Sequence, residues 1–119
     1  LDEVHDGQIP WLSAVQDERL APAMDRVLSD PGQPHSLDSL SEASGMSRSS
    51  FAERFAASTG RTPMDFVRET RIRAAGKLLT TTDLSVDGVA DRVGFASRSH
   101  FSRSFRDYFQ KTPSEFRAG

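Results

Sequence analysis

The clearest hydrophobic pattern in the chain is a pair of phenylalanines spaced four residues apart, and it occurs twice. The two pairs are Phe51 with Phe55 and Phe101 with Phe105. Residues four apart lie one above the other on a helix, so each pair predicts a helix whose phenylalanine face is buried. A serine that can accept a hydrogen bond from a first-turn amide precedes each pair, Ser47 in one case and Ser97 in the other.

A shorter apolar pattern comes before each phenylalanine helix and ends at a glycine. Leu37, Leu40 and Ala43 precede Gly45, and Val86, Val89, Ala90 and Val93 precede Gly94. A short helix, a glycine turn and a second helix are typical of a helix-turn-helix unit. We therefore predict one unit at about residues 36–60 and another at about 85–110, related by an offset of 49 residues before the turn and 50 after it.

The remaining apolar positions predict a long helix between the units and one helix ahead of them. Thr62 and Pro63 suit the start of a helix over residues 63–80, which would join the two units. Leu20, Met24, Val27 and Leu28 have the spacing of a core-facing helix over 17–29. Residues 1–16 show no clean period, and we interpret them as a linker or tail in which Trp11 and Leu12 could anchor on the domain. The chain is predicted to be all-α, with one domain at 17–119.

Charge is divided unevenly between the two parts of the chain. The net charge of −2 argues, taken alone, against a nucleic-acid partner. Residues 1–46, however, hold two basic residues (Lys or Arg) and nine acidic ones, whereas residues 47–119 hold thirteen basic residues and eight acidic ones. A basic second part favours contact with phosphate. The chain has no cysteine, which excludes disulfides, thiolate zinc sites and cysteine nucleophiles, and no apolar run long enough to span a membrane.

The outward face of the second phenylalanine helix carries the best candidates for DNA contact. Arg103 lies opposite Phe101 and Phe105 on that helix, and arginine can bridge O6 and N7 of guanine in the major groove. The candidates for base contact beside it are Ser99, His100 and Ser102. Phosphate contact is expected from Arg98 and Arg106.

The first phenylalanine helix offers a weaker set. Ser49 and Glu53 are its candidates for base contact, since glutamate can accept from cytosine N4. Arg48 matches Arg98 at the helix start, and the flanking residues Arg61, Arg68 and Lys111 are expected on the DNA backbone. The alternative for each arginine is a solvated charge or a salt bridge to Asp91, Asp107 or Glu69.

Residues 17–117 as a whole resemble the DNA-binding domain of the AraC/XylS family of bacterial transcription regulators. The resemblance is strongest over 83–86, 94–105 and 112–117, and it includes 45–49 and 73–79. It implies seven helices, two reading units in one monomer, and a separate sensor domain to which residues 1–16 would be the linker. A small-molecule effector would act only through that sensor domain, which the sequence lacks. The expected function is sequence-specific binding to operator or promoter DNA in the major groove, with activation of transcription, in the cytoplasm on the nucleoid.

Two positions depart from the family pattern. Gln110 stands where the family usually has glycine and where the first unit has Gly60, so that corner is expected to differ in shape. The outward arc of the first phenylalanine helix is Ser49, Ala52, Glu53 and Ala56, which offers few hydrogen bonds to bases. We therefore expect the second unit to carry more of the specificity.

Other classes of function fit the sequence less well. His5, His35 and His100 are far apart without metal-ligand spacing, and no serine lies on a sharp nucleophile turn, so no enzyme, metal or cofactor is predicted. The alternative is a helical protein-interaction module without DNA binding of its own. The acidic helix at 17–29 could dock on a partner such as RNA polymerase, and no membrane partner is expected.

Overall fold

Side-chain caps begin several helices at the predicted residues. In the computed structural model, which describes residues 9–119, Ser47 and Ser97 each accept a hydrogen bond from the amide three residues ahead. Thr112 and Glu115 form a reciprocal pair in which each side chain accepts from the other residue's amide. Such caps satisfy amides that have no partner within the helix, and they fix where each helix starts.

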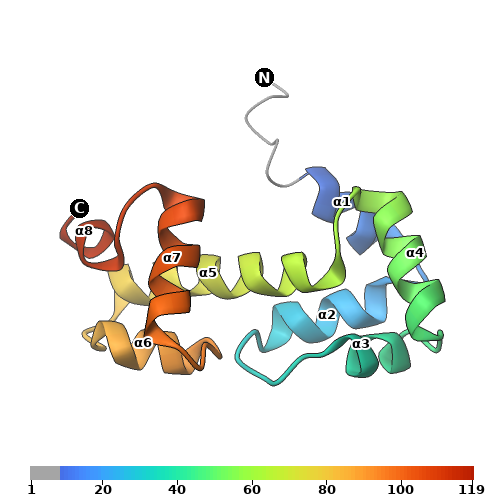
Figure 1. The fold of residues 1–119 in the computed structure, drawn as a ribbon, viewed down its shortest axis with the longest axis horizontal. Coiled ribbons are helices and arrows are strands. Elements are labelled where there is room, and N and C mark those ends of the chain that lie inside the picture. Colours follow the sequence, from blue (N-terminus) through green and yellow to red (C-terminus); the bar gives the residue numbers. More distant parts are fainter. Residues whose placement is uncertain (1–8) are drawn as a thin grey trace. The chain divides into compact units, whose positions relative to one another are not determined.

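The described residues contain eight helices and no strand, so the predicted all-α class is confirmed (Figure 1). The helices are α1 (Ile9–Gln16), α2 (Ala21–Ser29), α3 (Leu37–Ala43), α4 (Arg48–Thr59), α5 (Pro63–Thr81), α6 (Val86–Arg92), α7 (Arg98–Phe109) and α8 (Pro113–Ala118). The family resemblance implied seven helices. The additional helix is α1, which lies in the segment interpreted as a linker. No helix among these residues is long and apolar enough to cross a membrane.

The described chain forms two compact units. The first contains the chain up to Asp30 together with His35–Val67, and the second contains Pro31–Pro34 with Arg68–Gly119. Helix α5 starts in the first unit and continues in the second. The pair α3 and α4 therefore belongs to the first unit, and the pair α6 and α7 to the second.

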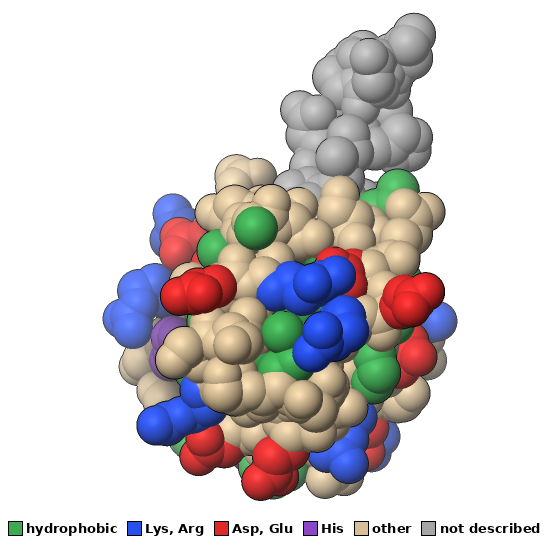
Figure 2. Space-filling view, turned by 90° about the vertical axis from the view of Figure 1, so that its right-hand side faces the viewer, with side chains coloured by type: hydrophobic (Ala, Val, Ile, Leu, Met, Phe, Trp, Pro, Cys, Tyr) green, Lys and Arg blue, Asp and Glu red, His purple; other side chains and the backbone are tan. Residues whose placement is uncertain are grey.

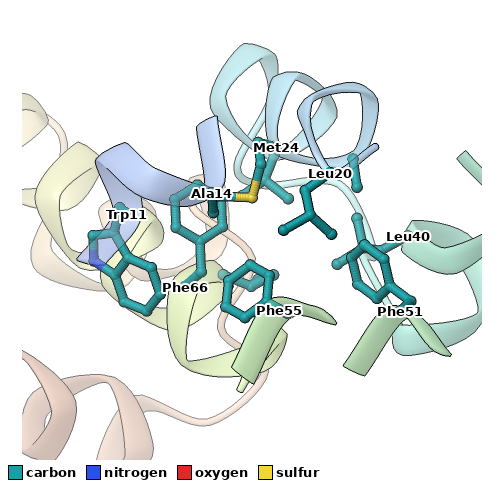
Figure 3. Close-up of a cluster of buried hydrophobic side chains, with 11 residues drawn as sticks. Trp11, Ala14, Leu20, Met24, Leu40, Phe51, Phe55 and Phe66 are labelled. Carbon is teal, nitrogen blue, oxygen red and sulfur yellow. The ribbon is translucent and has the colours of Figure 1, made fainter. Parts of the chain in front are cut away.

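The core of the first unit is built around the aromatic residues of α4 and the start of α5. Phe51 and Phe55 are fully buried, and Phe66 packs against Phe55 with ring centroids 6.4 Å apart (Figure 3). Leu20 and Met24 are also buried in this cluster. The predicted four-residue phenylalanine spacing thus produces a buried face in α4.

Helix α1 belongs to this core, although residues 1–16 were interpreted as a linker or tail. Trp11 is 4% exposed and packs edge-on against Phe66, and Ala14 is fully buried (Figure 3). The guanidinium of Arg61 lies 4.8 Å from the centre of the Trp11 ring. The hydrophobic core of the first unit therefore begins before Asp17, at a helix that the mixed composition of the segment concealed.

Leu28 departs from the predicted core face of α2. Leu20, Met24 and Val27 are buried as expected, whereas Leu28 is 45% exposed. At 100° per residue Leu28 lies about 80° round the helix from Leu20, at the edge of the apolar stripe. It also lies in the last turn, one residue before α2 ends at Ser29.

The core of the second unit repeats the aromatic arrangement around α7. Phe101 and Phe105 are fully buried, and the Phe105 ring lies 4.7 Å from that of Phe109 and 5.3 Å from that of Phe116. Gly76 of α5 faces these rings, because a Cβ atom there would lie 3.0 Å from Phe109. Close packing therefore explains a glycine inside a long helix.

A half-buried arginine holds the loop between α2 and α3 in the second unit. Arg71 donates from Nε to the Pro31 carbonyl at 2.8 Å and from a terminal nitrogen to the Gln33 carbonyl at 2.7 Å. Burial lowers the pKa of Arg71. A Cβ atom on Gly32 would lie 2.3 Å from the Arg92 carbonyl, so only glycine allows this close approach. The loop between α2 and α3 is thereby part of the second unit.

The corner after α7 has the same shape as the corner after α4, contrary to expectation. Gln110 adopts the left-handed conformation with φ 59°, and Gly60 does so with φ 75°. Each amide donates to the carbonyl four residues earlier. Gln110 also donates from its side chain to the Asp107 carbonyl at 2.7 Å, which helps a non-glycine residue to adopt this strained backbone.

Glycine at this corner should stabilise the second unit. Gln110→Gly removes the left-handed strain and is expected to raise the free energy of unfolding by up to about 1 kcal/mol, net of the lost side-chain hydrogen bond. Gly60→Gln is the matched reverse change, with open space for a Cβ atom, and is expected to lower it by about 1–2 kcal/mol. Urea unfolding followed by circular dichroism measures both. A stability loss in Gln110→Gly would show that the side-chain bond matters more than the strain.

An ion pair in the first unit predicts a defined response to acid. Arg54 Nε donates to both carboxylate oxygens of Asp17, at 3.1 and 2.9 Å, and this bond lowers the pKa of Asp17 below its ordinary value of 3.8. A carboxyl group whose pKa is lowered by folding stabilises the fold above its unfolded-state pKa. The contribution is lost as the pH falls through the folded-state pKa.

Asp17→Asn should therefore reduce stability at neutral pH by up to about 1 kcal/mol and have no effect once the pH lies well below the folded-state pKa. Urea unfolding can be followed by the fluorescence of Trp11, the one tryptophan of the chain, which is buried in this unit. A difference between variant and parent that persists unchanged at low pH would contradict the assignment to this ion pair.

Candidate nucleic-acid interface

The two phenylalanines of α7 orient the rest of that helix toward solvent. With Phe101 and Phe105 fully buried, Ser99 and His100 are exposed on the first turn and Ser102 is half-buried beside them. All three predicted neighbours of Arg103 are therefore partly or fully accessible. The face opposite the core is polar along the first half of the helix, where a reading helix contacts base edges.

Arg103 places a solvent-exposed hydrogen-bond donor on this face. It is exposed, and within the described part of the chain no acidic side chain forms an ion pair with it. A free guanidinium keeps its fork of N–H donors for a new acceptor, which suits bidentate contact with guanine.

The His100 ring is held in place from behind. It stands edge-on to Phe95, with ring centroids 5.3 Å apart, while remaining exposed. Phe95 in turn packs against Phe101 in the core. A ring supported in this way loses less conformational freedom on contact with a ligand than an unsupported one.

The outward face of α4 has a different chemical character. Ser49 and Glu53 are exposed as predicted, but the neighbouring positions are the half-buried Ala52 and the exposed Ala56. Figure 2, which faces the side where α4 lies in Figure 1, shows basic and acidic side chains interspersed. This surface offers phosphate no continuous positive patch.

Both helices nevertheless begin with a positive end. Neither α4 nor α7 has an acid in its first turn, and each starts with an arginine, Arg48 or Arg98. The free amides and the helix dipole already favour an anion at that end. An arginine there is unfavourable for the helix itself, so it requires an anionic partner.

Acids from the preceding helices pair with these two arginines, a feature that the sequence analysis missed. Arg48 Nε lies 3.3 Å from Asp38 Oδ1, and Arg98 forms the equivalent ion pair with Asp87. The offset of 49 residues before the turn relates Asp38 to Asp87, and the offset of 50 after it relates Arg48 to Arg98. The residues of each pair are too far apart along the chain for helical spacing to predict their contact.

The other predicted phosphate ligands lie in varied surroundings. Arg61 is half-buried over Trp11 and lies 4.0 Å from Asp65, and Arg68 is half-buried. Arg106 and Lys111 are exposed. The pKa of Glu115 is lowered mainly by the hydrogen bond that its carboxylate accepts from the Thr112 amide. The positive charges of Arg106 and Lys111 lower it further. The exposed pair is thus better placed to contact phosphate than Arg61, whose guanidinium already contacts an aromatic ring and a carboxylate.

Within the described residues, no group of three or more His, Asp or Glu side chains could hold a metal ion. The candidate side chains of α4 and α7 lie on an exposed surface. Its strongest part is the first half of α7, where a free arginine, a supported histidine and two serines lie close together along the helix.

Comparison with known proteins identifies the fold. A family model described as a helix-turn-helix domain matches residues 40–119. The transcriptional regulator AlkR of Acinetobacter baylyi is 33% identical over 107 residues, which is 90% of this chain and 35% of that protein. The transcriptional activator RclR of Escherichia coli K12 is 34% identical over 106 residues, 89% of this chain and 37% of that protein. The chain thus spans about a third of the length of these curated relatives.

Solved structures agree with the sequence relatives. A regulator from Chromobacterium violaceum of the AraC-type DNA-binding class has a TM-score of 0.82 and 30% identity, with 88% of this chain and 94% of that chain covered. The DNA-binding domain of AdpA, solved with a target DNA, has a TM-score of 0.79 and 33% identity, with 84% of this chain and 90% of that chain covered. This chain belongs to the AraC/XylS family of transcriptional regulators and carries that family's helix-turn-helix DNA-binding domain.

Proposed function

We propose that the chain binds double-stranded DNA sequence-specifically, with α7 in the major groove as its main reading helix. The observation that carries this proposal is Arg103, which is exposed on the face of α7 opposite the buried phenylalanines and has no ion-pair partner among the described residues. Ser99, His100 and Ser102 provide further hydrogen-bonding groups on the same part of the helix. Support also comes from AdpA, whose similar domain was solved with a target DNA.

The first unit would contribute less sequence information. Its candidates are Ser49 and Glu53, and the alanines beside them cannot hydrogen-bond a base. Glutamate is repelled by phosphate and can contact only a base with a donor, such as cytosine. In this proposal α4 mainly supports affinity, and α7 supplies most of the discrimination between sequences.

Phosphate contacts would come from Arg98 and Arg106 around α7, from Lys111 after it, and from Arg48 at the start of α4. Arg61 and Arg68 are weaker members of the predicted set, because both are half-buried.

The remaining proposals concern the whole protein. They are activation of transcription, as in the name of the relative RclR, contact with RNA polymerase, an effector bound by a separate sensor domain, and action on the nucleoid in the cytoplasm.

Fluorescence anisotropy of the purified chain with a pool of random duplexes, at several salt concentrations, tests the proposal. We expect the logarithm of the binding constant to fall linearly with the logarithm of the salt concentration, because phosphate contacts release counterions. Sequencing of the bound fraction should show an enriched motif containing at least one G·C pair. The absence of salt-dependent binding would favour the protein-interaction alternative.

A further inference from the structure

The two units contain the same ion pair at the same structural position. Asp38 is the second residue of α3 and Asp87 is the second residue of α6, while Arg48 and Arg98 are the first residues of α4 and α7. Each aspartate pairs with the arginine of its own unit. The second turn contains one residue more than the first, and the contact is nevertheless formed in both.

These pairs are too exposed to contribute much to folding. The side chains of Arg48 and Asp38 are 66% and 70% exposed, and those of Arg98 and Asp87 are 50% and 74% exposed. Exposed ion pairs are largely screened by water and contribute little to stability. An acid at the start of α3 or α6 favours that helix through its dipole, but this does not explain why each arginine turns toward the acid.

The same exposure leaves each arginine accessible to an incoming phosphate. We infer that Asp38 and Asp87 compete with DNA phosphate for Arg48 and Arg98, and so weaken the electrostatic part of DNA binding. This inference rests on the proposed DNA-binding function. An arginine that must leave a carboxylate to reach a phosphate gains less on binding than a free one, so affinity is lower and depends less steeply on salt.

The test compares Asp38→Asn and Asp87→Asn with two matched variants, Glu42→Gln in α3 and Asp91→Asn in α6. Glu42 and Asp91 are exposed acids on the same two helices, and no ion pair joins them to another described residue. Each of the four variants removes one negative charge. Anisotropy with a random duplex across a salt series measures affinity and its salt dependence, and circular dichroism checks that each variant is folded.

We expect each aspartate variant of the ion pairs to bind DNA about two- to fivefold more tightly than its matched control at moderate salt. The salt dependence should steepen by up to about one counterion for each arginine released. The increase must require the arginine: in an Arg98→Gln background, Asp87→Asn should change affinity no more than Asp91→Asn does. The same comparison applies to Arg48→Gln with Asp38→Asn and Glu42→Gln.

Three outcomes would overturn the inference. Equal effects of Asp87→Asn and Asp91→Asn would mean that only net charge matters. Weaker binding by Asp87→Asn would mean that the acid positions Arg98 for phosphate instead of competing for it. If the unaltered chain shows no salt-dependent binding, the proposed function itself fails, whereas normal binding with either of the first two results removes only this inference.

Discussion

Replacing Phe105 with alanine is expected to lower the free energy of unfolding of the second unit by about 3–5 kcal/mol. Phe105 is fully buried, and its ring contacts those of Phe101, Phe109 and Phe116 at centroid distances of 5.8, 4.7 and 5.3 Å. Truncation leaves a cavity that the surrounding rings fill only in part. Because small domains are stable by only about 5–15 kcal/mol, such a loss approaches the whole stability of the unit.

Urea unfolding followed by circular dichroism measures this loss, and Phe55→Ala is the matched change in the first unit. Phe55 is also fully buried, and its ring lies 5.8 Å from that of Trp11, so tryptophan fluorescence reports its unfolding directly. Phe105→Ala should alter the circular dichroism transition and leave the Trp11 signal less affected than Phe55→Ala does. A loss below about 1 kcal/mol would contradict the role of Phe105 as a core residue.

Replacing Arg103 with alanine is expected to weaken binding to the preferred sequence by about 1–3 kcal/mol, or roughly five- to 150-fold. The guanidinium is exposed on the reading face of α7 and has no acidic partner among the described side chains, so its removal affects a ligand and not the fold. Selection from random duplexes should show that preference at one base pair is lost. The rest of the enriched motif should be retained.

Arg92→Ala is the control for charge alone. Arg92 is an exposed arginine in the last turn of α6, so this variant removes the same charge from the same unit outside the reading helix. It should weaken binding to all sequences by a similar small factor. If Arg103→Ala also weakened binding to every sequence equally, Arg103 would be a phosphate ligand, and the base-contact assignment would be wrong.

Local sequence patterns predicted most of the fold because the features concerned act over short distances. The spacing of Phe51 with Phe55 predicted a buried helix face, and Ser47 and Ser97 predicted helix starts. Each depends on residues within about one turn of helix. The long helix was predicted at 63–80 and runs from Pro63 to Thr81 for the same reason.

The features that were missed depend on contacts between distant residues. Trp11 is buried because Phe55 and Phe66 come to lie beside it, and its own segment does not indicate which residues would cover it. The segment 31–34 lies in the second unit, where its carbonyls accept from Arg71, and this contact joins residues about 40 positions apart. Gln110 was expected to give the corner after α7 a different shape from the corner after α4. Its backbone is nevertheless left-handed, because the end of the helix determines the conformation at this position more strongly than the type of side chain does.

The candidate site was predictable in outline for the same reason. The sequence indicated which side chains of α7 face outward, since Phe101 and Phe105 determine the buried side. It did not indicate which cations are already paired. Arg98 and Arg103 are both exposed arginines of α7, but only Arg98 has a carboxylate partner in the described chain, supplied by a different helix.

The role of α7 as the reading helix is tested most directly by a two-dimensional NMR titration of the isotope-labelled chain with a duplex obtained by selection. We predict the largest amide shifts at the start of α7, from Ser97 to Arg103, with a change at the Arg103 side chain. Smaller shifts should occur around Ser49 and Glu53 in α4. If the largest shifts instead fell on the exposed side of α2 around Leu28, with α7 unchanged, α7 would not be the reading helix and the account would be wrong.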